Sequence, residues 1–95
     1  MTAYLVGSVN GVSDPAKFEE YRNRVGATME PYGAKYLAAA PGERVEGKWE
    51  PMVAAIIEFP SMDALKAWYT CEAYQELKQL RQGAADIDIL FVEGV

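Results

Sequence analysis

Glu58 has the clearest potential for acid–base chemistry in this chain. It lies in the otherwise apolar segment Met52 to Phe59, directly before Phe59. A carboxyl group withdrawn from water has a raised pKa and becomes a usable general acid or base near neutral pH. Other interpretations stay open, because a carboxylate at the end of a strand is also found solvated or paired with an arginine. We treat Glu58 as the candidate catalytic residue.

Three further charged residues are candidates for a polar cluster around Glu58, namely Arg44, Glu46 and Arg81. The planar guanidinium of arginine holds a carboxylate through two parallel hydrogen bonds. These residues are therefore candidates for binding a substrate. Structural ion pairing is the commoner use of such side chains, so both roles stay open.

The aromatic residues suggest either a pocket or a core. Trp49 falls in a predicted loop, Gly47 to Pro51. An indole there either seals the contact between two subunits, which we favour, or covers a flat aromatic ligand. Trp68, Tyr69 and Tyr74 either line a binding pocket beneath a helix or fill the core. Their helical spacing favours the core.

The composition excludes several classes of chemistry. The chain has no histidine and a single cysteine, Cys71. This excludes Ser-His-Asp triads, histidine-ligated zinc, proximal-histidine haem and an internal disulfide, and we expect no metal and no cofactor. Nine basic against fourteen acidic residues give a net charge of −5. That charge argues against nucleic acid and against anionic membranes as partners.

The length and the N-terminal segment indicate a small intracellular domain. The 95 residues suffice for one domain, which we place at 1–95. The segment Met1 to Gly7 lacks the basic and long apolar regions of a signal peptide. The longest apolar run, Met52 to Ile57, is far too short to cross a bilayer. We therefore expect a cytoplasmic protein.

Two predicted helices position the candidate residues. Asp14 followed by Pro15 is typical of a helix start, and this helix is predicted to close near Tyr32 with Gly33 behind it. The second helix is predicted to start after Pro60, with Ser61 as N-cap, and to end at Gly83. Thr70 is predicted to be a second N-cap at which this helix breaks and restarts.

Four predicted strands complete the pattern. They are Ala3 to Asn10, Ala34 to Ala40, Met52 to Phe59 and Asp86 to Glu93, with Glu43 to Glu46 as an extension of the second strand into a short hairpin arm. The order β-α-β-β-α-β predicts the α+β class and a ferredoxin-like plait: a four-stranded antiparallel sheet with two helices on one face.

The uncovered face of this sheet predicts a homodimer. The segments Tyr4 to Val9 and Met52 to Phe59 are apolar on both faces, while the helices cover only one. A second sheet from an identical subunit is the simplest cover, and two-fold symmetry is the commonest arrangement. The expected assembly is a dimeric α/β barrel.

Nearly the whole chain, from about Tyr4 to Gly94, also resembles an uncharacterised bacterial family of small dimeric α/β-barrel proteins, a domain of unknown function. The residues that carry the resemblance are Glu46-Gly47-x-Trp49, Ile57-Glu58-Phe59-Pro60-Ser61-Met62, Trp68-Tyr69, Glu72-x-Tyr74 and Arg81-x-Gly83-Ala84-Ala85. The resemblance implies the same fold and dimer, and it supplies no reaction. More distant relatives with this barrel include cofactor-independent quinone-forming monooxygenases, muconolactone isomerases and haem-dependent chlorite dismutases.

These observations leave three functions to weigh. The first is a cofactor-independent enzyme, monooxygenase- or isomerase-like, that acts on a small cyclic or aromatic molecule. The second is a non-catalytic small-molecule-binding protein, and the third is a structural dimer. A pocket with a perturbed carboxylate favours the first, and an apolar pocket without a titratable wall favours the second. A filled core without a pocket favours the third.

Overall fold

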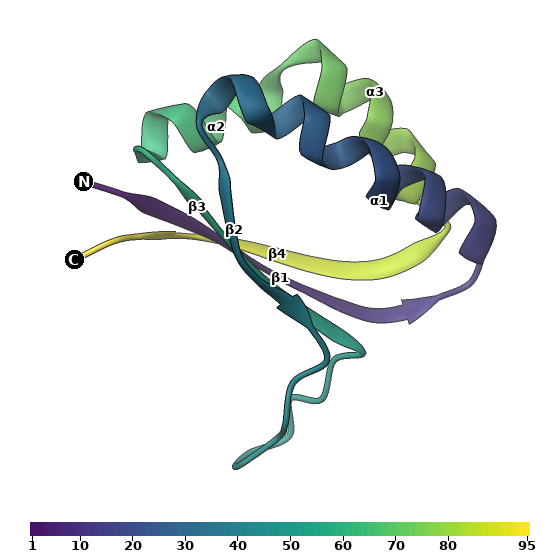
Figure 1. Cartoon of the computed structure of the whole chain (residues 1–95). Helices are drawn as coiled ribbons and strands as arrows, with labels where there is room; N and C mark the ends of the chain where they lie inside the picture. Colours follow the sequence, from purple (N-terminus) through teal and green to yellow (C-terminus); the bar gives the residue numbers. More distant parts are fainter.

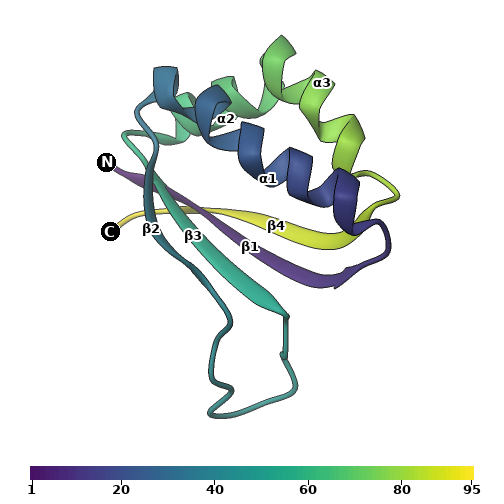
Figure 2. The ribbon, with the colours of Figure 1, turned by 45° about the vertical axis from the view of Figure 1, so that its right-hand side comes forward.

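The predicted ferredoxin-like α+β fold is confirmed by a computed structural model that describes all 95 residues. The four strands form one antiparallel sheet in the order β2-β3-β1-β4. All helices lie on one face of the sheet, and the two chain ends lie close together at the same end of the neighbouring strands β1 and β4 (Figures 1 and 2). The elements are β1 (Ala3–Val12), α1 (Pro15–Met29), η1 (Glu30–Tyr32), β2 (Lys35–Ala40), β3 (Val53–Phe59), α2 (Met62–Thr70), α3 (Glu72–Arg81) and β4 (Ala85–Glu93).

The start and end of α1 follow from its flanking residues. The Asp14 side chain accepts a hydrogen bond from the Lys17 backbone N–H at 3.2 Å, and Pro15 occupies the first turn. At the other end the helix tightens into the 3-10 turn η1, and Gly33 stops it with φ of 77°. Both predicted boundaries are therefore confirmed.

We expect Gly33→Ala to lower the free energy of unfolding by about 2 kcal/mol, since a side chain is strained in the left-handed conformation. An added Cβ would also lie 2.8 Å from Cγ of Pro60. Gly26→Ala is the matched control, because Gly26 lies inside α1 with open space around it. That change should raise the free energy of unfolding by about 0.5–1 kcal/mol. Urea unfolding measures both, and equal effects would contradict the argument.

The second helix breaks one residue later than predicted. The Ser61 side chain accepts a hydrogen bond from the Ala64 N–H at 3.1 Å and caps α2, as expected. Thr70 is not an N-cap, because its hydroxyl donates back to the Lys66 carbonyl at 2.9 Å as the last residue of α2. A threonine inside a helix often satisfies its hydroxyl in this way. Cys71, in an extended conformation, separates α2 from α3.

The predicted hairpin extension at Glu43 to Glu46 is wrong. Strand β2 ends at Ala40, before Pro41 and Gly42, and β3 begins at Val53. Proline cannot donate to a strand ladder, which explains the early end. Residues 41–52 instead form an exposed loop, which we call the β2–β3 arm. The arm extends beyond the sheet on the side away from the helices (Figures 1 and 2).

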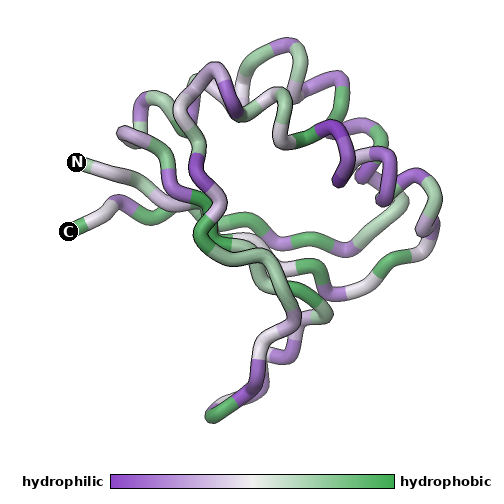
Figure 3. Tube along the Cα trace, in the orientation of Figure 1, coloured by the Kyte–Doolittle hydropathy of each residue, from purple (hydrophilic) through white to green (hydrophobic).

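The core lies between the helices and one face of the sheet. Its largest fully buried side chains are Trp68, Tyr74, Phe59 and Leu65. Hydrophobic stretches recur along the strands. On the helices, hydrophobic residues alternate with hydrophilic ones (Figure 3). Only 15 of 95 residues are buried in the single chain, so this core is thin for its length. No helix combines the length and hydrophobicity that a bilayer crossing requires.

The other face of the sheet, which we call the outer face, carries an apolar row across all four strands. By strand register, Leu90 lies opposite Val6, Val6 lies opposite Ile56, and Ile56 lies opposite Ala38. Opposite residues share one face of a sheet. Leu90 is 61% exposed, and Ile56 is also exposed. The outer face is therefore the apolar, helix-free surface that the sequence predicts.

Candidate functional site

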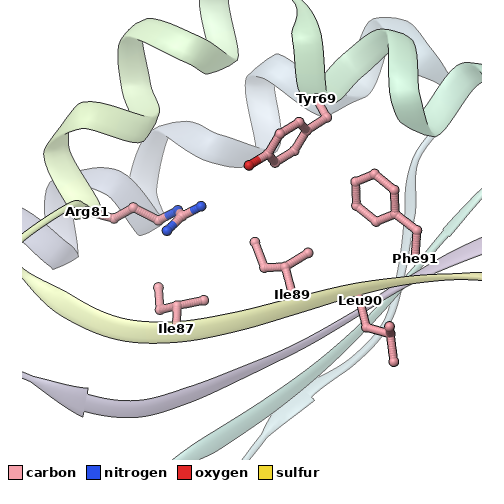
Figure 4. A pocket seen from close by; sticks show the side chains of 6 residues that line it. All are labelled: Tyr69, Arg81, Ile87, Ile89, Leu90 and Phe91. Atoms are coloured by element: carbon pink, nitrogen blue, oxygen red, sulfur yellow. The ribbon is translucent and has the colours of Figure 1, made fainter.

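A cavity of about 430 Å³ lies between β4 and the ends of α2 and α3. It is bordered by Tyr69, Arg81, Ile87, Ile89, Leu90 and Phe91 (Figure 4). Ile87, Ile89 and Phe91 alternate along β4 and point toward the helices, whereas the Leu90 side chain points to the outer face. This volume falls within the range of about 300–1,000 Å³ that is usual for small-molecule sites.

Arg81 supplies the charge of the cavity. It is the last residue of α3, half-buried, and its guanidinium extends between Tyr69 and Ile87 (Figure 4). Its Nε donates a hydrogen bond to the Tyr74 hydroxyl at 3.3 Å. The salt bridges of the chain are Arg24–Glu20 and Arg44–Glu50, so no carboxylate pairs with Arg81.

Two buried tyrosines, Tyr21 and Tyr74, contact Arg81 from the core. The Tyr21 and Tyr74 hydroxyls are 3.1 Å apart, and Cζ of Arg81 lies 6.0 Å from the Tyr21 ring centroid. Burial, reinforced by the charge and hydrogen bond of Tyr74, raises the pKa of the Tyr21 phenol. Burial alone lowers the pKa of Arg81, but its interactions with the neighbouring Tyr74 and Tyr21 phenols outweigh that effect, so the net shift is upward. Arg81 is therefore a permanent cation.

The raised pKa of Tyr21 predicts a loss of stability in alkali. An unfolded tyrosine ionises near pH 10, whereas Tyr21 in the folded chain keeps its proton to higher pH. Its stabilising contribution is complete below about pH 10 and is lost above it, because only the unfolded chain then releases the proton. The free energy of unfolding should fall less steeply above pH 10 in Tyr21→Phe than in the wild type. The free energy of unfolding of both proteins is measured by urea unfolding at several pH values. The same slope above pH 10 in the variant and the wild type would contradict this assignment.

Aromatic side chains form the other end of the cavity. The Tyr69 and Phe91 rings meet edge to face, with centroids 5.6 Å apart. Nζ of Lys78 lies 5.1 Å from the Tyr69 ring centroid, which places a second cation beside the same wall. Rings in this arrangement present both a face and an edge to a bound ring. The cavity thus combines an aromatic wall, an aliphatic floor on β4 and a guanidinium.

The structure brings some of the candidate residues together at this cavity. Arg81 and Tyr69 line it, and Tyr74 contacts Arg81 from the core. Trp68 lies in the core, 1% exposed, with its Nε1 donating to the Thr28 hydroxyl at 3.0 Å. The three aromatic candidates therefore have different roles. Trp68 and Tyr74 fill the core, as their helical spacing favours, while Tyr69 borders the cavity.

The remaining candidates lie elsewhere. Glu58 is on the outer face, where it lies opposite Tyr4 and Lys35 in the strand register. Arg44 is in the β2–β3 arm and pairs with Glu50 at 3.3 Å. Glu46 and Trp49 are exposed in the same arm. The predicted cluster of Arg44, Glu46 and Arg81 around Glu58 does not form within one chain, because the sheet separates Arg81 from Glu58.

Sequence reasoning missed four residues of the site. Ile87, Ile89 and Phe91 alternate along the predicted strand Asp86 to Glu93 and therefore share one of its faces, but only the fold places that face against Arg81. Lys78 was not singled out. Its signal was available, because 74, 78 and 81 share one face of a helix at spacings of four and three.

The cavity combines apolar walls with one cation, the Arg81 guanidinium. No carboxylate and no imidazole borders it, so its lining offers no strong general base. A guanidinium and neighbouring phenols can stabilise negative charge on an oxygen of a bound molecule.

Comparison with known proteins places the fold among structures of related architecture. No functionally curated protein matches this chain. A protein of unknown function from Rhodopseudomonas palustris superposes with a TM-score of 0.79 at 18% identity, over 99% of this chain and 82% of that one. A dimeric ferredoxin-like protein of unknown function from Jannaschia sp. gives 0.77 at 13% identity, over 99% and 100%. SnoaB, a cofactor-independent oxygenase from Streptomyces nogalater, gives 0.71 at 12% identity, over 99% and 93%.

At these identities the structural similarity establishes the fold alone. The family rests on a separate finding: the family model described as a domain of unknown function, DUF1330, matches residues 2–95. This agrees with the resemblance seen in the Glu58 and Trp68-Tyr69 segments. The chain therefore belongs to the DUF1330 family.

Proposed function

We propose that this protein is a homodimer that binds a small cyclic or aromatic molecule in the cavity between β4 and α3 of each subunit. The observation that carries the proposal is the lining itself. Tyr69 and Phe91 offer ring contacts, Ile87 and Ile89 form an apolar floor, and Arg81 supplies one polar anchor. Small-molecule sites commonly combine mostly apolar walls with a few placed polar groups.

Binding is favoured over catalysis because the cavity lacks a base. Glu58, the candidate catalytic carboxylate, lies on the other side of the sheet from this cavity. A ring held there meets phenols and a guanidinium, which bind and orient more readily than they remove a proton from carbon.

A cofactor-independent oxygenase or isomerase is the second candidate function. The Arg81–Tyr74–Tyr21 contacts favour it, since they can stabilise the enolate or phenolate of an already acidic substrate. In the oxygenase form the substrate anion would itself reduce dioxygen, without metal or organic cofactor. The fold similarity to SnoaB supports this candidate at the level of architecture only.

The homodimer follows from the outer face. Its apolar row of Leu90, Val6, Ile56 and Ala38 is open to water in the single chain. Soluble monomers rarely leave a contiguous apolar face of this kind uncovered. In the dimer two such faces pack together, and Trp49 of the β2–β3 arm, 61% exposed in the single chain, packs at the seam. Glu58 lies at the same interface.

The first test is native mass spectrometry of protein purified from cells that express it naturally. We expect a dimer that retains a small molecule at one copy per subunit. A panel of ring compounds, neutral and charged, is then titrated while backbone amide NMR signals are followed. Binding should shift the signals of β4 and α3. The variant Ile89→Trp fills the cavity and should abolish those shifts while the protein stays folded. A panel that moves no signal of β4 would overturn the proposed function.

A further inference from the structure

We infer that the ligand of this cavity is a planar ring bearing a carboxylate group, and that Arg81 binds the carboxylate through its two terminal nitrogens. The inference rests on the proposed function, whose ligand it specifies further. It assigns Arg81 as the residue that selects an anion, and Tyr69 and Phe91 as the residues that select a ring.

The first argument is the missing partner of Arg81. The chain carries fourteen acidic residues against nine basic ones, yet none of those carboxylates pairs with this guanidinium. Arg24 and Arg44, both in exposed positions, have carboxylate partners at 3.9 and 3.3 Å. A half-buried cation over an apolar floor is costly without a counter-charge. An anionic ligand supplies that counter-charge.

The second argument is the number of free donors. Nε of Arg81 is already engaged, because it donates to the Tyr74 hydroxyl at 3.3 Å. The bond to Tyr74 also fixes the plane of the guanidinium against the core. The two terminal nitrogens extend into the cavity (Figure 4). Two parallel donors match the two oxygens of a carboxylate.

The third argument separates a carboxylate from a phosphate. Arg81 is the last residue of α3, and the C-terminal end of a helix carries partial negative charge. This partial negative charge at the end of α3 repels a dianion more strongly than a group with a single negative charge. No helix N-terminus borders the cavity to provide the backbone N–H groups that phosphate sites commonly use. A group with a single negative charge fits this setting better.

The fourth argument concerns the body of the ligand. A ring beside the carboxylate would lie over Ile87 and Ile89 and against the edge-to-face pair Tyr69–Phe91. Lys78 over the Tyr69 ring adds positive charge to the same end. A flexible chain could bury its methylene groups against the floor and the two rings, but it would lack the additional ring–ring interaction that an aromatic ligand gains.

The test compares matched pairs of compounds by NMR titration of the full-length protein. The probes are benzoate with benzamide, and 1-naphthoate with 1-naphthamide, which differ in charge but little in shape. Hexanoate is the acyclic acid. We expect each ring carboxylate to bind at least tenfold more tightly than its amide and more tightly than hexanoate, with shifts at Ile87, Ile89 and Phe91.

Two variants locate the selectivity. Arg81→Gln should reduce the carboxylate-to-amide ratio to about one, while Arg81→Lys, which keeps the charge but not the planar fork, should retain part of it. Arg22→Gln is the matched control, since it removes the same charge from an exposed position on α1, and it should leave the ratio unchanged.

The outcomes separate this inference from the proposed function. If amides bind as tightly as carboxylates, or if Arg81→Gln keeps the ratio, the anion assignment is overturned and the cavity still binds rings. If hexanoate binds as tightly as benzoate, the ring assignment is overturned. If no probe shifts β4, both the inference and the proposed function are overturned.

Discussion

Leu90→Lys is expected to convert the protein from a dimer into a folded monomer at micromolar concentration. Leu90 lies at one end of the apolar row that crosses the outer face, opposite Val6 in the register. Among the large side chains of that row it is the most exposed. Two-fold symmetry would place one such lysine from each subunit in the same interface.

The size of the effect follows from the cost of burying a charge. An ammonium group placed in an apolar interface without a counter-charge costs several kcal/mol. Even about 3 kcal/mol raises the dissociation constant roughly a hundredfold. The single chain should keep its fold, because the position is already open to water and its side chain points away from the helices.

Sedimentation velocity measures the expected change directly. Gln79→Lys is the control. Gln79 is exposed on α3, so this substitution introduces the same charge on the helix side of the molecule. It should leave the sedimentation coefficient unchanged. A dimeric Leu90→Lys, or a monomeric wild type, would show that the outer face is not the subunit interface. Circular dichroism checks that each variant stays folded.

The sequence alone was sufficient for most of the fold because each boundary has a local chemical cause. Asp14 and Pro15 start α1, Gly33 ends it, and Ser61 starts α2. These residues act within one turn of their own position, so no tertiary information is needed. Thr70 illustrates the limit: its hydroxyl can cap a new helix or bond back into the preceding one, and both are local options.

Glu58 shows why the candidate site could not be predicted in the same way. The segment around it is apolar on both faces, so alternation does not tell which face meets the helices. That choice depends on the pairing of β3 with β1, which places Ile57 and Phe59 in the core and Glu58 on the outer face. Strand register is a long-range property of the sheet.

Arg81 shows the converse case. Its residue type marked it as a binding candidate, but its surroundings come from three separate parts of the chain. Tyr21 lies on α1, Tyr74 on α3, and Ile87 on β4. Nothing local brings them together. The cavity exists only because α3 ends directly above β4, so its lining could be identified only with the fold in hand.

Trp68→Ala is expected to lower the free energy of unfolding by about 3–5 kcal/mol, as large aromatic deletions in a core do. Trp68 is almost completely buried, its ring centroid lies 4.1 Å from that of Tyr74 and 5.6 Å from that of Phe59, and its Nε1 bonds to Thr28. Small domains have total stabilities near the lower end of about 5–15 kcal/mol, so this one change removes a large share.

Two companion variants separate packing from hydrogen bonding at Trp68. Thr28→Val removes the acceptor of the indole N–H and keeps the ring, so it should cost about 1–3 kcal/mol. Lys66→Ala changes an exposed position on the same helix and should stay within about 0.5 kcal/mol of the wild type. All are measured by urea unfolding at one protein concentration, because the proposed dimer would make apparent stability depend on concentration. A cost for Trp68→Ala no larger than that of Thr28→Val would mean that the ring itself contributes little.

The same variant connects the core to the cavity. Tyr74 packs against Trp68 on one side and accepts the hydrogen bond of Arg81 on the other. Removing the indole frees the Tyr74 ring to move into the space left behind, and Arg81 then loses the support that fixes its guanidinium plane. Trp68→Ala should therefore weaken benzoate binding in conditions where the variant is still folded, although Trp68 does not border the cavity. Unchanged benzoate affinity in the folded variant would show that Arg81 is positioned without help from this part of the core.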